Sequence, residues 1–260
     1  MKFAKRSLGQ NFLIDQNIIK KIISLVKIKN QNVIEIGPGS GALTEEIFKR
    51  EPKTFTVIEK DNHLAKELNK KYYKKEIKIY NEDILRFDLQ KLNMKNSIIF
   101  GNLPYNISSQ IFVKFIRLNK LHLQINNLIF MFQKELGEKI ISNYPSKKYG
   151  RLSILSNLKF NISSNFLVSP NCFYPKPKIN SMIIHFVPKK KINYNIKEIG
   201  NLEKITNIFF SNKRKMINKS LKKIFKNNEF EKIKELKTQL RPENVKPEIY
   251  YKITELFEKS

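Results

Sequence analysis

The sequence predicts an α/β protein in which a mainly parallel, doubly wound sheet is followed by a small all-helical domain. Two observations support this fold class. Short apolar runs alternate with helically patterned segments between residues 32 and 136, which is typical of βαβ units. After residue 196 only helical patterns remain, so a helical domain is expected at the carboxyl end.

The elements of the sheet region follow in a regular order. A first helix is expected over residues 15–28, where isoleucines recur at helical spacing and Asp15 is a suitable N-cap. The chain then reads strand, helix, strand, helix, strand, strand, helix and strand-into-helix, over residues 32–37, 42–50, 55–61, 64–73, 77–83, 97–105, 108–118 and 127–136. The predicted sheet therefore forms from repeated strand–helix units.

The carboxyl-terminal region begins after a late strand over residues 181–188. The next stretch, "KKKINYN" (189–195), is interpreted as a linker because the composition shifts there. One apolar stripe at helical spacing is expected to form the core beyond it: Ile205, Ile208, Phe209, Ile217, Leu221, Ile224 and Phe225. We therefore place the domains at residues 1–188 and 189–260.

The composition indicates a polyanionic partner. The chain of 260 residues has a formal net charge of +27, which favours nucleic acid, with an anionic membrane surface as the alternative. The single cysteine, Cys172, excludes an intramolecular disulfide and fits a reducing cytoplasm. The three histidines show no metal-ligand spacing, and no signal peptide or membrane-spanning run is found. A soluble protein without a metal is expected.

A glycine-rich turn, "VIEIGPGSGALT" (33–44), follows the first predicted strand of the sheet. Gly37 and Gly39 let the backbone turn sharply and approach a ligand, and the next helix directs its positive N-terminus toward it. The pattern fits both a nicotinamide cofactor and S-adenosylmethionine, while the absence of Gly-Lys-[Ser/Thr] argues against a P-loop. The alternative is a tight turn without a ligand.

Two acids end the next two strands. Glu59 lies about twenty residues after the glycines, where a carboxylate can accept both hydroxyls of a ribose. Asp83 can accept from an adenine amino group, with Ile84 packed on the ring. The alternatives are a solvated acid at residue 59 and a turn cap at residue 83.

The stretch "GNLPYNIS" (101–108) ends the fourth strand of the sheet. It delivers Asn102, Leu103, Pro104 and Tyr105 to the carboxyl edge, where open α/β sheets bind ligands. Pro104 keeps Leu103 extended, so nearby carbonyls face outward as acceptors, and Tyr105 adds a flat face for stacking. Two acceptors and a stacking face suit an exocyclic amine on a planar ring. The alternative is an ordinary Pro-Tyr turn.

With these motifs the chain resembles the adenine-N6 dimethyltransferases of ribosomal RNA, and among them the KsgA-type small-subunit branch. The resemblance covers nearly the whole chain, and each motif follows the family order. Further matching stretches are "LGQNFLID" (8–15), "QKE" (133–135), "YGRLS" (149–153), "FYPKPKINS" (173–181), "NKRKMINKSL" (212–221) and "RPENV" (241–245). Leu8 departs from the family, which usually carries an aromatic residue before the Gly-Gln.

The resemblance implies a Rossmann-like sheet that binds S-adenosylmethionine. The cofactor-binding residues it implies, with those argued above, are Asn11, Leu13, Gly37, Gly39, Glu59, Asp83, Ile84 and Asn102. It also implies that Phe173 forms the second wall of a sandwich around the target base, with a core aromatic as the alternative reading. Asn102, Leu103, Pro104, Tyr105 and Phe173 are thus the candidate catalytic residues.

The chemistry follows from the weak nucleophilicity of an adenine amine. If Asn102 and a carbonyl in the Pro104 region accept its two N–H bonds, the nitrogen can pyramidalise and expose its lone pair to a methyl donor. The target base must leave its helix or loop to reach such a pocket. No strong general base is required, because the product can lose its proton after transfer.

A basic face is expected on the helical domain. Its residues would contact RNA phosphates without reading sequence, or else form a solvated lysine face: Lys213, Arg214, Lys215, Lys219, Lys222 and Lys223.

The expected protein is a cytoplasmic, monomeric enzyme that dimethylates two adjacent adenines in a 3′-terminal hairpin loop of 16S rRNA within an immature 30S particle. The alternatives are a large-subunit (23S) enzyme of the macrolide-resistance type and a non-catalytic small-subunit assembly factor. A complete methyl-donor site argues against the assembly factor, which has no need of one. A dehydrogenase is disfavoured because nothing resembles a hydride-accepting substrate site.

Overall fold

The computed structural model describes residues 9–92 and 94–260, so Leu8 lies outside the described part of the chain. The chain divides into two compact units. The sheet unit comprises residues up to 137 together with 161–188, and the helical unit comprises 138–160 with 189–260. The predicted boundary after residue 188 coincides with one boundary between the units, whereas residues 138–160 group with the helical unit. The division into domains at residue 188 itself stays a prediction.

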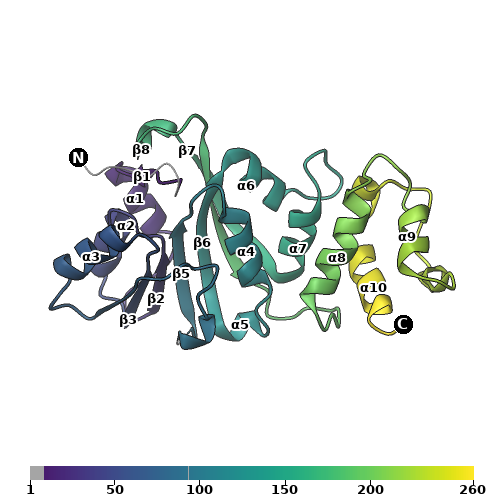
Figure 1. The fold of residues 1–260 in the computed structure, drawn as a ribbon, viewed down its shortest axis with the longest axis horizontal. Coiled ribbons are helices and arrows are strands. Elements are labelled where there is room, and N and C mark those ends of the chain that lie inside the picture. Colours follow the sequence, from purple (N-terminus) through teal and green to yellow (C-terminus); the bar gives the residue numbers. More distant parts are fainter. Residues whose placement is uncertain (1–8, 93) are drawn as a thin grey trace. The chain divides into compact units, whose positions relative to one another are not determined.

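The sheet unit contains a seven-stranded sheet in the order β4-β3-β2-β5-β6-β9-β7 (Figure 1). Neighbouring strands from β4 to β6 pair in parallel, and β9 pairs with β6 in the antiparallel direction. The strands are β2 (Asn32–Ile36), β3 (Thr54–Ile58), β4 (Ile77–Tyr80), β5 (Ser97–Asn102), β6 (Ile125–Gln133), β7 (Phe160–Val168) and β9 (Ser181–Pro188). The predicted α/β, Rossmann-like fold class is confirmed.

Helices cover both faces of this sheet, as its nearly continuous apolar strands require. One core cluster contains every second residue of several strands together with isoleucines and leucines of three helices. These helices are α1 (Gln16–Ile23), α2 (Ala42–Phe48) and α3 (Asn62–Lys71). On the opposite face, aromatic residues of α4 (Ser108–Ile116) pack edge-on against those of β6. The strand order explains this arrangement, because the chain winds from the centre of the sheet in two opposite directions. With right-handed crossovers, the two directions put their helices on opposite faces.

The helical unit is built from α7 (Arg151–Lys159), α8 (Ile199–Phe210), α9 (Asn218–Ile224) and α10 (Pro247–Phe257). The helix α6 (Lys134–Ile141) runs from the sheet unit into it, and α5 (Leu121–Gln124) is a single turn before β6. Buried tyrosines tie its segments together: Tyr149 donates to the Val245 carbonyl (3.1 Å) and Tyr251 to the Ile154 carbonyl (2.8 Å). Two of the family-like stretches, 149–153 and 241–245, thus meet through a structural contact.

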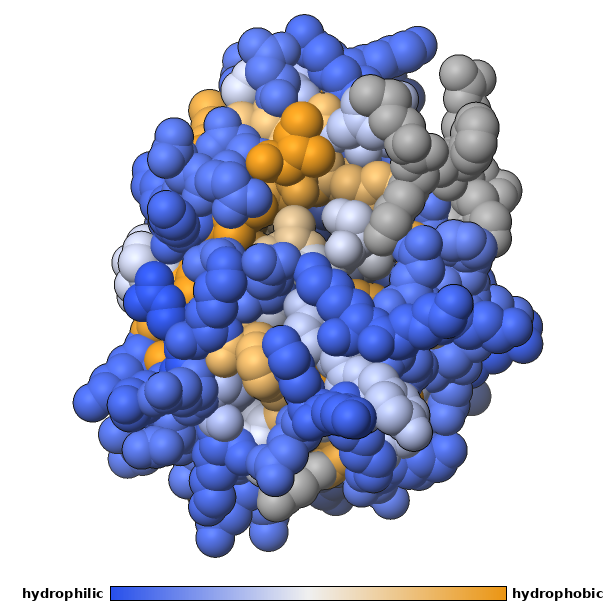
Figure 2. All heavy atoms as spheres, turned by 90° about the vertical axis from the view of Figure 1, so that its left-hand side faces the viewer, coloured by the Kyte–Doolittle hydropathy of each residue, from blue (hydrophilic) through white to orange (hydrophobic). Residues whose placement is uncertain are grey.

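Three strands escaped the sequence prediction. The strands β1 (Phe12–Leu13) and β8 (Phe173–Tyr174) form a separate two-stranded antiparallel ribbon, and β7 lies at the edge of the main sheet. Figure 2 shows the side of the molecule at the left of Figure 1, where hydrophilic residues predominate and hydrophobic residues are exposed mainly in the upper part. Large exposed apolar residues of the sheet unit include Ile14, Leu167, Tyr174 and Ile179.

Candidate active site

A candidate ligand-binding cleft lies at the switch point of the sheet. The chain winds from β2 to β3 and β4 in one direction and from β5 to β6 in the other, so β2 and β5 are neighbours whose helices diverge. Ile36 pairs with Gly101, which brings the ends of these strands side by side. A cleft of about 1060 Å³, including open solvent at its mouth, lies over the ends of β2, β3, β4 and β5 and under residues 9–13.

The glycine turn forms one wall of the cleft. Gly37 and Gly39 both have positive φ (64° and 57°), a conformation that other residues rarely adopt. A Cβ on Gly39 would lie 2.9 Å from the Phe12 ring, which is closer than real contacts allow. The turn, or glycine cradle, therefore favours glycine at both positions because of their positive φ, and at Gly39 also because a side chain would meet Phe12.

Glu59 is held at the end of β3 by two backbone N–H groups. Its Oε2 accepts from Gly39 at 3.0 Å and its Oε1 from Asp61 at 2.8 Å. Burial raises the pKa of Glu59, and these hydrogen bonds only partly oppose the shift. Each carboxylate oxygen keeps a further lone pair, so the side chain can accept hydroxyl hydrogens from a ligand in the cleft.

Asp83 follows β4 and is an ionised acceptor. Its Oδ2 forms an ion pair with Lys60 (2.8 Å), and its Oδ1 accepts from the Leu85 N–H (2.9 Å). Burial acts to raise the pKa of Asp83, but the hydrogen bonds and the positive charge of Lys60 together lower it. Ile84 lies beside it as an apolar part of the cleft wall. The pair offers an acceptor next to an apolar side chain.

The amide of Asn102 has a fixed orientation. Its Nδ2 donates to the Asn11 carbonyl at 3.0 Å, which leaves Oδ1 as the acceptor for a ligand. The Pro104 carbonyl already accepts from the Ile107 N–H (3.1 Å), whereas the Leu103 carbonyl accepts no hydrogen bond from any residue that the structure describes. The acceptor expected in the Pro104 region is therefore best supplied by the Leu103 carbonyl.

Tyr105 lies half-buried in the cleft wall, and its hydroxyl is bound to a serine of a distant strand. The Tyr105 hydroxyl and Ser181 Oγ are 2.5 Å apart, and Ser181 on β9 is fully buried. Burial raises the pKa of Tyr105, so the phenol stays neutral. One hydrogen bond thus restricts the ring of the residue expected to stack on a base.

Phe173 does not line the cleft. It lies in β8, is 3% exposed and belongs to the same core cluster as Cys172. This placement agrees with the alternative reading, a core aromatic residue, and leaves the expected second wall of the sandwich without support from the geometry. All the other candidate catalytic and cofactor-binding residues line the cleft.

Sequence reasoning overlooked Glu35, which also lines the cleft. This β2 residue is 1% exposed, and its Oε2 accepts from the Thr44 hydroxyl at 2.7 Å. Burial raises its pKa to about 8, and the nearby charge of Glu59 adds to the shift. Its signal was an acid inside the apolar strand "VIEIG". Lys60, Ser181 and Phe12 were also missed, because their roles depend on contacts across the fold.

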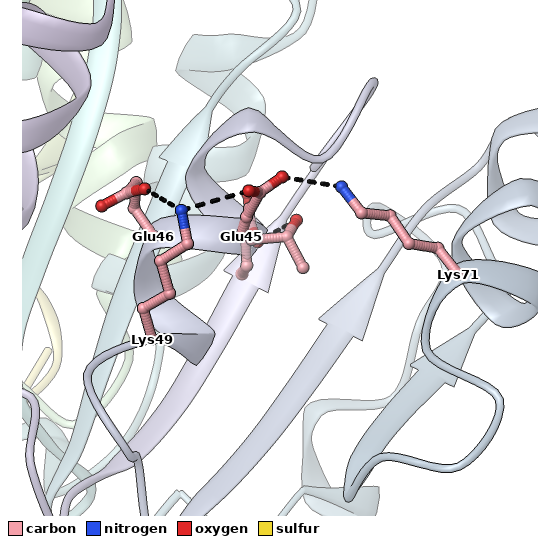
Figure 3. A network of polar contacts seen from close by, with 6 residues as sticks. Glu45, Glu46, Lys49 and Lys71 are labelled. Carbon is pink, nitrogen blue, oxygen red and sulfur yellow. Dashed lines mark hydrogen bonds and ion pairs between the residues drawn. The ribbon is translucent and has the colours of Figure 1, made fainter.

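The six predicted RNA-binding residues are exposed around the start and along α9 of the helical unit. Within the described part of the chain, none of them forms an ion pair. By contrast, on α2 and α3 Glu45 is paired with both Lys49 (3.1 Å) and Lys71 (2.8 Å), as Figure 3 shows. The charge around α9 is therefore available to an anionic partner.

Comparison with known proteins decides the family. Residues 1–259 match the model of the family described as ribosomal RNA adenine dimethylase. The chain belongs to this family. A relative from Pelagibacter ubique (strain HTCC1062), "Ribosomal RNA small subunit methyltransferase A", is 44% identical over 98% of this chain and 97% of its own length. A relative of the same name from Malacoplasma penetrans (strain HF-2) is 38% identical over 96% of this chain and 91% of its own.

Solved structures agree with the observed fold. A dimethyladenosine transferase from Plasmodium falciparum covers 95% of this chain and 98% of its own, with a TM-score of 0.76 and 24% identity. The 23S rRNA methyltransferase ErmE covers 95% and 100%, with a TM-score of 0.71 and 23% identity. At these identities both support the fold alone.

Members of the rRNA adenine dimethylase family use S-adenosylmethionine as methyl donor, and the cleft fits it. The open glycine cradle, the acceptors at the ends of β3 and β4 and the apolar wall between them match a ligand with a ribose, an adenine and a charged tail. In residues 9–92 and 94–260, no three His, Cys, Asp or Glu side chains are grouped as a metal site. Within the same residues, no helix combines the length and apolar character that a membrane span needs.

Proposed function

We propose that this member of the rRNA adenine dimethylase family makes N6,N6-dimethyladenine at two adjacent adenines in the 3′-terminal hairpin loop of 16S rRNA. The relatives that are 38–44% identical over nearly the full chain are named as small-subunit methyltransferases, which supports this choice of subunit. We further propose that the protein acts in the cytoplasm as a monomer on an immature 30S particle, and that methylation is coupled to maturation of that particle.

Within the cleft, we assign the binding of S-adenosylmethionine to residues at the four strand ends and the N-terminal segment. Glu59 accepts from the ribose, Asp83 accepts from the adenine amine, and Ile84 packs on the adenine ring. The remaining contacts come from Asn11, Leu13, Gly37, Gly39 and Asn102. When bound, S-adenosylmethionine supplies an electrophilic methyl group.

The catalytic contribution of the protein is to orient the target amine. Asn102 Oδ1 and the Leu103 carbonyl each accept one N–H of the amine, which favours a pyramidal nitrogen with its lone pair toward the methyl donor. The Tyr105 ring stacks on the flipped base. When the new N–C bond has formed, the nitrogen loses one proton to solvent, so no buried base is needed.

The same pair of acceptors explains how a second methyl group can be added. A monomethylated amine keeps one N–H, so one of the two acceptors still orients it. The nitrogen lone pair is then again directed at the donor side of the cleft. The observation that carries the proposal is the fixed amide of Asn102 beside the glycine turn, because an oriented acceptor there supports methyl transfer to an amine.

The decisive experiment is to incubate the protein with radiolabelled S-adenosylmethionine and unmethylated small or large ribosomal subunits, and to map the label by primer extension. Label at two adjacent adenines of the small-subunit rRNA is expected. Label only on the large subunit would instead indicate an enzyme of the resistance type. Binding to immature small subunits without label would indicate an assembly factor.

A further inference from the structure

An exposed segment of the sheet unit connects two walls of the cleft. Residues 174–180, "YPKPKIN", begin at β8, where Tyr174 pairs with Phe12 of the cleft wall. They end at Ser181, whose hydroxyl is bound to Tyr105 of the same cleft. The Asn180 carbonyl also accepts from the Lys134 N–H at 2.9 Å. The segment is therefore fixed at both ends to residues that line the cleft.

The composition of this segment suits nucleic acid. Tyr174 is 45% exposed and Ile179 43%, and Lys176 and Lys178 are exposed between them. Neither lysine forms an ion pair with a described residue, and the segment carries no acid. Pro175 and Pro177 restrict the backbone, so little further conformational freedom is lost on binding. An exposed aromatic face with flanking cations is how proteins bind single-stranded RNA.

We propose that residues 174–180 form the site that binds the RNA strand flanking the target adenine, with a neighbouring base stacked on Tyr174 and phosphates bound by Lys176 and Lys178. This inference rests on the proposed function, because it assumes that the cleft receives an RNA base. A base flipped into the cleft leaves its neighbours unstacked, and an aromatic residue at the cleft mouth replaces part of the lost stacking. An apolar protein partner would gain nothing from two unpaired lysines in the middle of the surface.

The chain offers a matched control. Tyr73 is 83% exposed, and Lys70 and Lys74 beside it are exposed and lack ion pairs within the described residues. These residues precede β4 and lie toward its amino end, whereas the cleft lies over its carboxyl end. They thus reproduce the chemistry of the segment without its position.

The test measures the affinity for a short adenine-containing single-stranded RNA over a range of salt concentrations. Tyr174→Ala is expected to weaken binding roughly tenfold, while Tyr174→Phe, which keeps the ring, stays close to wild type. The variant Lys176→Gln/Lys178→Gln is expected to reduce the slope of log affinity against log salt by about 1.4, at about 0.7 per phosphate contact. Affinity for S-adenosylmethionine should be unchanged in each variant, which separates RNA contact from a structural effect.

Tyr73→Ala and Lys70→Gln/Lys74→Gln should behave like wild type. Equal salt slopes for the two double variants, or equal affinities for Tyr174→Ala and Tyr73→Ala, would overturn the proposed site. If the wild-type protein labels no rRNA but its segment variants lose RNA affinity as expected, the proposed function fails and the RNA site stands. If the wild-type protein labels rRNA and the segment variants match the controls, the proposed function stands and the RNA site fails.

Discussion

At the residue scale, the candidate site depends on polar groups whose orientation is set by a second partner. Asn102 presents its oxygen because its nitrogen is occupied by Asn11, and Glu59 is held by two N–H groups. Tyr105 is held by Ser181 in the same way. Such fixed groups do not reorganise during the reaction, which is what electrostatic preorganisation requires.

The first prediction concerns the acceptor itself. Asn102→Ala removes Oδ1 and is expected to lower kcat on the order of a hundredfold or more, by analogy with the loss of one preorganised hydrogen bond. RNA affinity should persist, because the lysines that we propose to contact RNA are remote in sequence and unchanged in this variant. Single-turnover methylation and RNA binding are measured in parallel. Full turnover by Asn102→Ala would contradict the assigned role.

The second prediction concerns the positioning of Tyr105 by Ser181. Ser181→Ala and Tyr105→Phe each remove the same hydrogen bond while leaving a stacking ring, so each should lower kcat by roughly tenfold with little change in affinity for S-adenosylmethionine. The double variant should be no slower than either single variant, because the bond is already lost. Additive losses would show that Ser181 does not act through Tyr105.

The third prediction uses the raised pKa of Glu35. The folded protein keeps this carboxyl protonated up to about pH 8, whereas the unfolded chain loses the proton near 4.5. Its stabilising contribution is therefore fully present below pH 4.5 and is lost as pH rises toward 8, with a slope of up to about 1.4 kcal/mol per pH unit. Glu35→Gln stays neutral and should lack this decline. Urea unfolding of both proteins across that pH range is the measurement, and identical pH profiles would rule out a neutral Glu35.

At the element scale, agreement between sequence and structure depends on the length of each periodic pattern. The long strand–helix alternation predicted β2 to β6 and α2 to α4 within a few residues, and Asp15 does cap α1 by accepting from the Ile18 N–H (3.0 Å). β1 and β8 have two residues each, too few for any periodicity. β7 was missed although apolar residues alternate at 160, 162, 166 and 168. Helix α1 ends at Ile23, earlier than the expected 28.

The candidate site shows the same limit. Motifs at strand ends predicted the cleft-lining residues, because parallel strands bring their carboxyl ends to one edge. The burial of Phe173 could not be predicted, since it follows from the β1–β8 pairing of two remote segments. The bond between Tyr105 and Ser181 has the same origin, because 75 intervening residues separate the two in the chain.

The fourth prediction concerns the glycine turn as an element. Gly39→Ala places a Cβ 2.9 Å from the Phe12 ring at a positive φ, so it should lower the free energy of unfolding by about 1 kcal/mol or more and weaken binding of S-adenosylmethionine. Gly200→Ala is the control, because it lies in α8 with nothing within 4 Å of the new Cβ. That change should be neutral or stabilising by up to about 1 kcal/mol. Calorimetric titration and urea unfolding measure both effects, and unimpaired cofactor binding by Gly39→Ala would contradict the cradle.

At the scale of the whole molecule, the net charge is +27, and the acidic residues that pair with lysines are unevenly distributed. On α2 and α3 lysines are paired with glutamates (Figure 3), so they add little to the attraction of a polyanion. The lysines around α9 and those of residues 174–180 are unpaired among the described residues. Lysines without an ion pair to a described residue are thus present on both units, and we propose that each set contacts RNA phosphates.

The fifth prediction tests the lysines of α9. The variant Lys219→Gln/Lys222→Gln/Lys223→Gln should lower affinity for unmethylated small subunits and reduce the salt slope by about 2 to 3, since each lost phosphate contact removes about 0.7 to 0.9. The variant Lys66→Gln/Lys70→Gln/Lys74→Gln removes the same net charge from exposed lysines of the sheet unit that form no ion pair with a described residue. If attraction came only from total charge, both triple variants would lose the same affinity. A larger slope change for the α9 variant, with unchanged binding of S-adenosylmethionine, is expected, because only its lysines would lie against the RNA backbone.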